Sequence, residues 1–349
     1  MSIQQTSTGK FIDGEEIIAI ELTNSKGTYV EIFNYGAIIN RFVVKNIKGE
    51  MQDIVLGFDD IEGYFDEKYL ENNPHIGSVI GRYANRIKGG KFSIEGVDYQ
   101  LEKNTGTDSL HGGIVGFDKK VWDIVELGEE NQSFVTLEYE SVNGEEGFPG
   151  SLIVDLTFEL TDNEELILTY EAETDKATAI NLTHHGYFNL SPNGDNVGKH
   201  KQQIFATNYL EQDDNYCVTG KLLPVKGTAL DFTESKELSK DWNPEEGYDQ
   251  TFVLDKTYGD LSLASKTFED ESGLTLSVYT TEPVAHLYTS KYLKAKNGKD
   301  GRDYGAYDAF CIETQHHPNA INIPEFPTTV LQPEDLYTQT TIFKVSLTK

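Results

Sequence analysis

The stretch LIVDLTFELTDNEELILTYEA, residues 152–172, shows the fold class of this chain most clearly. Apolar side chains stand at every second position over residues 152–160 and again over residues 166–172. Successive side chains of a β-strand point to opposite faces, so this period of two predicts strands with one buried face and one wetter face. The turn Asp162-Asn163-Glu164 separates the two runs, which together predict a β-hairpin.

Short runs of the same kind extend along the rest of the chain. They predict further strands at residues 29–33, 38–44, 53–57 and 274–280. Residues 59–70 predict a short helix, and no segment of about 11 residues or more shows helical periodicity. The spacing of strands and turns predicts an all-β fold. We expect one large antiparallel β-sandwich domain over residues 1–349, with a ligand cleft on a concave sheet.

The chain is strongly acidic. Its 349 residues include 58 aspartates and glutamates against 29 lysines and arginines, which gives a net charge of −29. No basic stripe stands out, which argues against a nucleic-acid partner, and the overall field would repel anionic ligands. We therefore expect a neutral small molecule as the ligand.

The two cysteines, Cys217 and Cys311, lie 94 residues apart, which is neither a disulfide framework nor a zinc pattern. The N-terminal residues show no signal peptide. No apolar segment approaches the ~20 residues of a membrane span. The expectation is a cytoplasmic protein that has no membrane partner, no metal and no cofactor.

The stretch NLTHHGYFNL, residues 181–190, holds the first candidate for catalysis. If it is a strand, His184 and His185 point to opposite faces, so only one of them can enter a pocket. A histidine can hold a proton near neutral pH, as an acid/base catalyst must. The alternative is a polar strand end with a hydrogen-bonded core histidine.

Two glycine-containing fragments add candidates for binding. In GRYANRIKGG, residues 81–90, Asn85 and Arg86 stand side by side at a turn. The fragment lacks the Gly-Lys-Ser/Thr of a phosphate loop. Arginine offers a fixed fork of donors to hydroxyl oxygens, or it can form a structural ion pair. In SLHGG, residues 109–113, two glycines give His111 a permissive backbone that suits close approach to a ligand.

Two acidic fragments complete the set. In GYDQTFVL, residues 247–254, Asp249 lies at a turn, where it can accept hydrogen bonds from two vicinal hydroxyls or simply form the turn. In AFCIETQHHP, residues 309–318, Glu313 ends an apolar strand. A carboxylate among apolar neighbours loses solvation, so its pKa should rise toward neutrality, which suits a general base. A purely structural Glu313 would need a nearby cation.

Together, these fragments resemble the galactose mutarotase (aldose 1-epimerase) family along almost the whole chain. The matching fragments stand in the family's order: NYGA at 34–37, DIVLGFD at 53–59, GRYANRI at 81–87, LHGG at 110–113, HHGYFNL at 184–190, GYDQTFVL at 247–254, TEP at 281–283 and ETQHHP at 313–318. The resemblance implies a β-sandwich of the mutarotase type. It also implies interconversion of the α and β anomers of free aldohexoses such as galactose and glucose.

The resemblance also implies roles for single residues. Glu313 matches the family's general base, His185 its general acid and His111 its second site histidine. The family's sugar-holding residues match Asn85, Arg86 and Asp249.

Three positions depart from the family's pattern. His184 stands where the family usually has asparagine, and Asn319 stands where aspartate is common. His286 stands where a glutamine typically contacts the sugar, so His286 is expected at the sugar and the preferred sugar stays open.

The chemistry of mutarotation agrees with these residues. A base removes the proton of the C1 hydroxyl, an acid delivers one to the ring oxygen, and the open aldehyde rotates before it recloses. We expect Glu313 to be ionised at neutral pH, because desolvation and nearby cations offset each other, and His185 to be protonated. Arg86 and His111 can stabilise charge that grows on the ring oxygen. A bell-shaped pH dependence of kcat/KM follows.

Four other functions fit parts of the pattern. His111, His185 and Glu313 could form a two-histidine, one-carboxylate metal site, although no local spacing supports it. A sugar-binding module could use the same pocket without catalysis. A mutarotase-like epimerase could act on a different or modified sugar, such as a phosphosugar, but no arginine cluster is evident. A carbohydrate-cleaving enzyme would need a second catalytic carboxylate, for which Asp249 is the only candidate.

Overall fold

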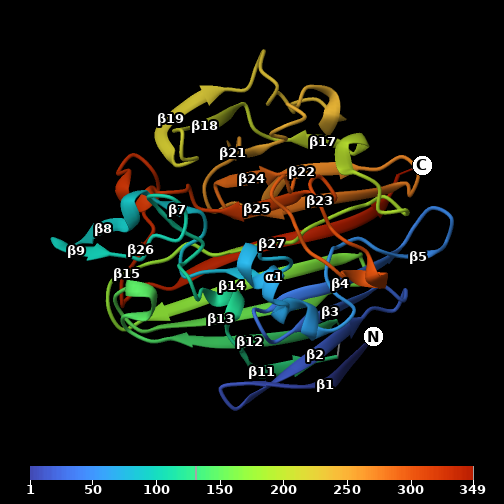
Figure 1. The fold of residues 1–349 in the computed structure, drawn as a ribbon, viewed down its shortest axis with the longest axis horizontal. Helices are drawn as coiled ribbons and strands as arrows, with labels where there is room; N and C mark the ends of the chain where they lie inside the picture. The colour runs from blue at the N-terminus through green and yellow to red at the C-terminus, as the bar shows by residue number, and fades with distance from the viewer. Residues whose placement is uncertain (130–131, 349) are drawn as a thin grey trace.

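The computed structural model describes residues 1–129 and 132–348, and strands dominate this part of the chain (Figure 1). Every ladder between its named strands is antiparallel. The predicted all-β, antiparallel sandwich is therefore confirmed.

A nine-stranded sheet forms the largest layer. In spatial order its strands are β11 (Asp123–Gly128), β12 (Ser133–Ser141), β13 (Leu152–Leu160), β14 (Glu165–Thr174), β27 (Tyr337–Leu347), β23 (Leu274–Thr280), β22 (Ser262–Phe268), β17 (Lys201–Ile204) and β20 (Lys236–Glu237).

Two five-stranded sheets and four short ladders complete the fold. The N-terminal sheet contains β1 (Ser2–Ile12), β2 (Glu15–Thr23), β3 (Tyr29–Phe33), β4 (Ile38–Lys45) and β5 (Met51–Asp53). The second sheet contains β19 (Val218–Pro224), β18 (Asn208–Gln212), β21 (Asp249–Val253), β24 (Val284–Tyr288) and β25 (Cys311–Gln315). The two-stranded ladders are β10 (Ser109–Leu110) with β7 (Arg86–Ile87), β16 (Thr183–His184) with β6 (Val79–Ile80), β8 (Lys91–Ile94) with β9 (Val97–Gln100), and β15 (Thr178–Ala179) with β26 (Val330–Leu331).

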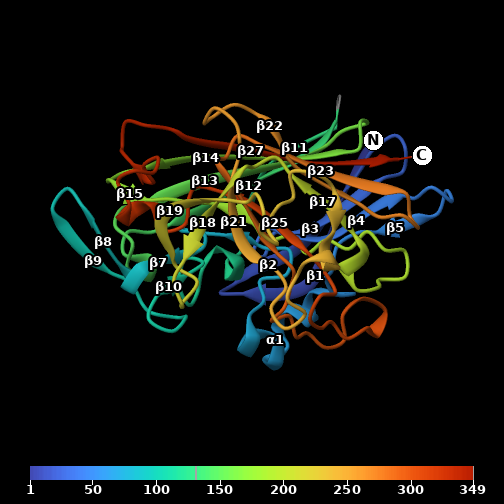
Figure 2. The ribbon, with the colours of Figure 1, turned by 90° about the horizontal axis from the view of Figure 1, so that it is seen from above.

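The predicted hairpin is β13 and β14, paired from Leu152↔Thr174 to Leu160↔Leu166. Its alternate side chains are buried as the period of two predicts. Burial of one such leucine side chain contributes about 1.5–3 kcal/mol. Figure 2 shows the long strands of the nine-stranded sheet as one layer, with β18, β21 and β25 in the layer beneath it. Because the largest hydrophobic cluster draws on residues from Ile20 to Val345, we infer one domain.

The strands predicted at residues 29–33, 38–44 and 274–280 are confirmed as β3, β4 and β23. The strand predicted at residues 53–57 is wrong, because β5 ends at Asp53. Beyond that point the chain leaves the N-terminal sheet and bonds to residues 187–189, with Leu56 N–H donating to the Tyr187 carbonyl and Val55 bridging Phe188.

The short helix predicted over residues 59–70 forms as two pieces. A 3-10 turn, η1, covers Ile61–Phe65, and α1 covers Glu67–Asn72. Asp66 separates them, because its carboxylate caps α1 by accepting the backbone N–H groups of Lys68 and Tyr69.

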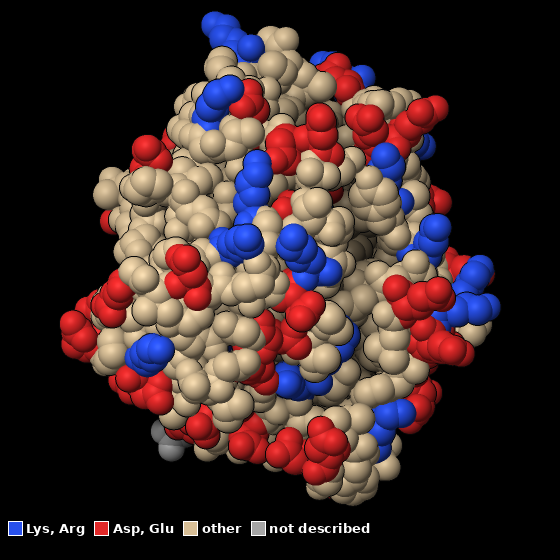
Figure 3. All heavy atoms as spheres, turned by 60° about the vertical axis from the view of Figure 1, so that its left-hand side comes forward, with Lys and Arg blue, Asp and Glu red and all other residues tan. Residues whose placement is uncertain are grey.

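The sequence also predicted no membrane span, no disulfide and no basic surface. No helix in the described residues is long and apolar enough to cross a membrane. Cys217 and Cys311 are both free and buried, so neither forms a disulfide. On the face drawn in Figure 3, acidic and basic side chains are interspersed, and no continuous basic surface crosses it.

The stretch 181–190 is a strand only at Thr183–His184, but the alternation of its histidines holds. The His184 side chain is buried against Phe158 of the nine-stranded sheet, with ring centroids 6.2 Å apart. Burial lowers the pKa of His184 to about 3, against backbone contacts that raise it, so the ring is neutral. His185 points the other way and lines a cavity.

His184→Asn should keep turnover near the wild-type value, because the ring contacts the core and not the cavity. The smaller side chain should lower the free energy of unfolding by about 1 kcal/mol, the centre of the usual range for point mutations. Denaturant unfolding and anomerisation rates measure both effects. His185→Asn is the matched control, and a folded His184→Asn protein that loses turnover would show that the two faces are misassigned.

Candidate active site

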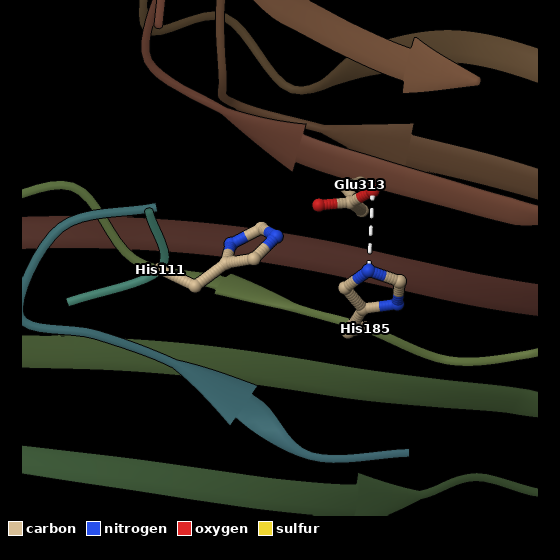
Figure 4. Close-up of side chains that lie close together, drawn as sticks. All are labelled: His111, His185 and Glu313. Atoms are coloured by element: carbon tan, nitrogen blue, oxygen red, sulfur yellow. Dashed lines mark ion pairs between the residues drawn. The ribbon is translucent and has the colours of Figure 1, made fainter. Parts of the chain in front are cut away.

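The structure brings all seven sequence-predicted site residues to one cavity of about 180 Å³: Asn85, Arg86, His111, His185, Asp249, His286 and Glu313. Figure 4 shows how three of them meet: Glu313 comes from β25, while His111 follows β10 and His185 follows β16 directly.

Three neighbouring strands form one wall of the cavity. Thr251 of β21, His286 of β24 and Glu313 of β25 lie directly opposite one another in the ladder. Directly opposite residues share a face of the sheet, so their side chains project together. Asp249 lies two residues before Thr251 and shares that face.

Two local assignments from the sequence are wrong by a few residues. Asp249 is not in a turn but is the first residue of β21. Glu313 does not end its strand but lies in the middle of β25, because β25 stays paired with β24 as far as Gln315.

His286 and Asp249 form an ion pair within this wall. His286 Nε2 lies 2.9 Å from Asp249 Oδ1, and His286 Nδ1 lies 2.8 Å from the Thr251 hydroxyl. Burial acts to lower the pKa of His286, but the hydrogen bond to Asp249 and the charges of Glu313 and Asp249 raise it. Burial acts to raise the pKa of Asp249, and the bond from His286 holds it below its usual value. The ion pair with His286 therefore favours the ionised form of Asp249.

Glu313 is the most deeply buried acid of the cavity, with a side chain 2% exposed. Burial raises its pKa to about 7, against the charges of His286 and Arg86, which lower it. Its Oε2 atom has no hydrogen-bond partner among the described residues. Desolvation is therefore the dominant influence on the pKa of Glu313, and the nearby cations offset only part of it.

His111 is held as a hydrogen-bond donor by the backbone of Asn85. β7 pairs with β10 through Arg86↔Leu110, which places the next residue, His111, beside Asn85. The Asn85 N–H donates to His111 Nδ1 at 3.3 Å, and the His111 N–H donates to the Asn85 carbonyl. Burial and the neighbouring cationic groups hold the pKa of His111 well below its usual value. Its single ring proton must then sit on Nε2, so the ring can donate a hydrogen bond into the site.

His185 faces Glu313 across the cavity, with 3.6 Å between Nε2 and Glu313 Oε1. The ring stacks on Tyr187 at 5.0 Å between centroids. Its Nδ1 is buried without a hydrogen-bond partner. Buried unpartnered polar atoms are rare in proteins, so those of His185 and Glu313 mark the place where a polar ligand fits.

The protonation states of this pair differ from the sequence expectation. Burial, with the charges of His75 and His286, holds the pKa of His185 well below its usual value. Both pKa shifts favour the form in which the proton of the pair rests on Glu313. The ionised pair, with the proton on His185, differs only in where that proton sits, so the two forms interconvert without exchange with solvent.

Arg86 reaches the cavity from β7 and lies over the Tyr216 ring, with its guanidinium carbon 5.5 Å from the ring centroid. No carboxylate among the described residues lies within ion-pair distance of it, and its Nε is buried without a partner. A structural ion pair therefore does not account for Arg86, whose fork of donors is free for a ligand.

His111, His185 and Glu313 also satisfy a geometric condition for a metal site, because one ligand atom of each lies within 4.8 Å of the others. The donor set fits poorly, since His111 Nε2 carries the ring proton and has no lone pair to offer.

Sequence reasoning missed several residues that line the cavity. These are Asn72, Asn73, Pro74, His75, Leu110, Tyr187, Tyr288 and Tyr292. Tyr187 stood within the quoted 181–190 stretch and could have been found from its two-residue spacing after His185. His75 had no such signal, because it lies in an irregular segment between α1 and β6.

Comparison with known proteins shows which family this chain resembles. A family model described as aldose 1-epimerase matches residues 19–344. The galactose mutarotase of Rattus norvegicus is 37% identical over 351 residues, covering 99% of each chain, and that of Homo sapiens is 40% identical over 323 residues, covering 91% of each. The aldose 1-epimerase of Escherichia coli K12 is 31% identical and covers 90% of each chain.

Solved structures agree with the sequence relatives. An aldose epimerase homologue from C. elegans is 32% identical and superimposes with a TM-score of 0.87, covering 95% of this chain and all of that one. A galactose 1-epimerase from Lactobacillus acidophilus, at 24% identity, shares the fold with a TM-score of 0.85 over nearly the whole of both chains. The chain therefore belongs to the aldose 1-epimerase family.

Proposed function

We propose that this protein is an aldose 1-epimerase that interconverts the α and β anomers of free aldohexoses, with Glu313 as base and His185 as acid. The observation that supports these roles best is the pair itself. A carboxylate with a raised pKa and an unpartnered oxygen lies 3.6 Å from an imidazole at one cavity.

The separation of the two groups suits the reaction. The C1 hydroxyl and the ring oxygen are both bonded to C1, so a base and an acid that serve them must lie a few ångströms apart. Glu313 takes the C1 hydroxyl proton, the bond from C1 to the ring oxygen breaks, and His185 protonates that oxygen. The aldehyde rotates about the C1–C2 bond and recloses from its other face as both proton transfers reverse. No proton is gained or lost over the cycle.

The remaining groups bind the sugar and stabilise the negative charge that develops on its oxygens. His111 offers its Nε2–H, and Arg86 its free donors, to oxygens on which negative charge develops. Asp249 has one oxygen engaged by His286 and can accept sugar hydroxyls with the other. Asn85 lines the same cavity and, like His286, is assigned to sugar binding.

The alternative functions receive less support. Cleavage of a glycosidic bond would require Asp249 as the second catalytic carboxylate, but Asp249 is ion-paired with His286. Arg86 is the only lysine or arginine among the residues lining the described cavity, so it lacks the cationic cluster that suits a phosphosugar. A pure binding protein has no need of the paired base and acid. The cytoplasmic location and the absence of nucleic-acid partners stay predictions.

Polarimetry of freshly dissolved α-galactose and α-glucose tests the function. The protein should speed the approach to anomeric equilibrium well above the spontaneous rate, without a change in the final rotation. A protein that binds these sugars without speeding equilibration would be a binding module instead.

Glu313→Gln keeps the shape and hydrogen-bonding capacity of the side chain but removes the base. It should lower kcat by about 10²–10⁴, the usual contribution of a general base, and leave sugar affinity close to wild type. Calorimetric titration with galactose supplies the affinity and polarimetry the rate. Near-normal turnover in this variant would mean that another group takes the proton.

The pH dependence of kcat/KM should be a bell in which His185 sets the acid limb and Glu313 the alkaline limb, the reverse of the order that an ionised Glu313 and a protonated His185 would give. The active form holds one proton in the Glu313–His185 pair. Activity should fall at low pH, where His185 becomes protonated while Glu313 already holds a proton. The lowered pKa of His185 puts this acid limb below pH 6.5. Activity should fall again near pH 7 as the last proton leaves Glu313, whose pKa is raised to about 7.

The temperature dependence of the alkaline limb separates the two assignments. A carboxyl group ionises with little heat, so its limb should move little between 10 and 35 °C, about the range in which such a protein stays folded. An imidazole limb would move clearly to lower pH on warming, which would contradict the exchanged assignment.

Asp249→Ala and Arg86→Ala should raise KM as well as lower kcat, because both side chains contact the sugar before and during ring opening.

His286→Gln is compared with Asp249→Ala, since it removes the positive charge of the ion pair but keeps a hydrogen-bonding side chain beside Asp249. It should also move the alkaline limb to higher pH, because the charge of His286 lowers the pKa of Glu313. Unchanged KM values in both alanine variants would remove these residues from sugar binding.

A further inference from the structure

Tyr216 lies against Arg86, and the mechanism above does not use it. The centroid of its ring is 5.5 Å from the guanidinium carbon, within the range of a cation–π contact. Arg86 is among the residues that line the cavity, and Tyr216 is not. The Tyr216 ring can therefore influence a ligand in the cavity through Arg86, although it does not itself border the space for that ligand.

An aromatic face suits this arginine better than a carboxylate would. A carboxylate holds a guanidinium by accepting its N–H groups, and each N–H that it accepts is lost to a ligand. An aromatic ring attracts the cation through its quadrupole and consumes no donor. The Nε of Arg86 is buried without a hydrogen-bond partner among the described residues. The contact with Tyr216 thus holds the side chain and leaves its fork of donors free.

Tyr216 stands in a tight connection, residues 213–217, between β18 and β19. Its φ of 62° lies in the left-handed region, which non-glycine residues rarely adopt. Asp213 closes the turn. Its carbonyl accepts the Tyr216 N–H at 2.9 Å, and its Oδ1 accepts the backbone N–H groups of Asn215 and Cys217 at 3.0 and 3.1 Å. These bonds fix the direction in which the Tyr216 ring leaves the backbone.

Two further contacts hold this turn beside the cavity. Lys88, two residues beyond Arg86, pairs with Asp213 at 2.9 Å between Nζ and Oδ2. The hydroxyl oxygens of Tyr216 and Tyr292 lie 3.2 Å apart, and Tyr292 lines the cavity. Figure 2 shows β18 and β19 beside β7, the strand that carries Arg86. The ring is therefore tied both to the segment of Arg86 and to a residue of the cavity wall.

We propose that Tyr216 is a positioning residue that acts through Arg86: its ring holds the guanidinium at the sugar and leaves the guanidinium N–H groups free for sugar oxygens. This inference rests on the proposed function, because it takes the ligand of the cavity to be a sugar. In this role Tyr216 does not contact the sugar itself.

The benefit of this contact is that Arg86 is already in place when the sugar arrives. An arginine side chain loses rotamer freedom when it binds a ligand, and this loss opposes binding. The contact with Tyr216 makes part of the loss a property of the folded protein. Because Arg86 is assigned both to sugar binding and to charge stabilisation, removal of the Tyr216 ring should weaken affinity and turnover together.

The test compares Tyr216→Asn with Tyr216→Phe. Asparagine tolerates the left-handed backbone and removes the ring, whereas phenylalanine keeps the ring and removes only the hydroxyl. The usual strength of a guanidinium–aromatic contact corresponds to about 2- to 30-fold in an equilibrium constant, which bounds the effect. Calorimetric titration with galactose should show a loss of affinity within this range for Tyr216→Asn, with KM raised and kcat lowered less than in Arg86→Ala. Tyr216→Phe should keep most of the wild-type affinity.

A double-mutant cycle shows whether Tyr216 acts through Arg86. In the Arg86→Ala background Tyr216→Asn should cause no further loss, because the group that the ring positions is absent. Affinity supplies the cycle, and kcat/KM supplies it where binding is too weak to titrate. A loss as large as in the wild-type background would overturn the proposal and make Tyr216 a sugar contact. Equal losses in Tyr216→Asn and Tyr216→Phe would also overturn it, because they assign the effect to the hydroxyl.

NMR of protein labelled at arginine reads the same contact without sugar or turnover. The Arg86 Nε–H signal, identified by its absence in Arg86→Ala, should exchange faster with water in Tyr216→Asn than in Tyr216→Phe. An unchanged signal in folded Tyr216→Asn overturns the positioning role. If the wild-type protein binds galactose without speeding its anomerisation, the proposed function fails, while a positive affinity cycle and a faster-exchanging signal still support the role of Tyr216.

Discussion

The active site depends on the burial of one carboxylate. Glu313 lies in the middle of β25, and the ladder with β24 leaves its side chain 2% exposed. A carboxylate deprived of water holds its proton more tightly, and this raises its pKa into the range in which it can accept and return a proton near neutral pH. Burial of an ionisable group is costly unless partners offset it, so the residues around Glu313 follow from this single constraint.

Two walls of the cavity, one of regular sheet and one of irregular segments, supply the residues around Glu313. One wall is regular sheet, where the register of β21, β24 and β25 places Thr251, His286 and Glu313 in one row. The other wall consists of short ladders and irregular segments, in which backbone hydrogen bonds hold His111 and His185. The regular wall supplies Glu313 and the ion pair of Asp249 and His286. The irregular wall supplies the two imidazoles, and the backbone N–H of Asn85 also sets the tautomer of His111.

Three polar groups that lack partners lie where the walls meet. Glu313 Oε2, His185 Nδ1 and Arg86 Nε are buried and make no hydrogen bond with the described residues. Protein interiors rarely leave such groups unsatisfied, and each costs about 1–3 kcal/mol. A sugar offers many hydroxyls and can satisfy several of these groups at once.

The sequence predicted the regular parts of the molecule better than the irregular ones. The hairpin of β13 and β14 followed directly from its period of two, because one face of each strand is buried. The apolar run at residues 53–57 is not a strand of that kind, because Ile54 still donates to the Phe42 carbonyl of β4 whereas Val55 and Leu56 pair with residues 187–188. Long-range pairing of this kind leaves no local pattern.

The candidate site shows the same division. All seven predicted residues line one cavity, since the family resemblance located them by short fragments. Their protonation was not predictable in the same way. The pKa of Glu313 is raised because the completed fold excludes water from it, and that exclusion depends on the register of three strands. His75 was missed because only tertiary contacts with Asp118 and His185 bring it to the site.

The most direct test of acid/base ring opening is NMR exchange spectroscopy of galactose in D₂O with catalytic amounts of the protein. The account predicts faster exchange between the α and β C1 proton signals, with both the C1 and C2 protons fully retained, because only hydroxyl protons move. Exchange no faster than in buffer alone would contradict it. Loss of the C2 proton signal to deuterium would contradict it as well, because that loss requires removal of a carbon-bound proton and hence a different isomerase reaction.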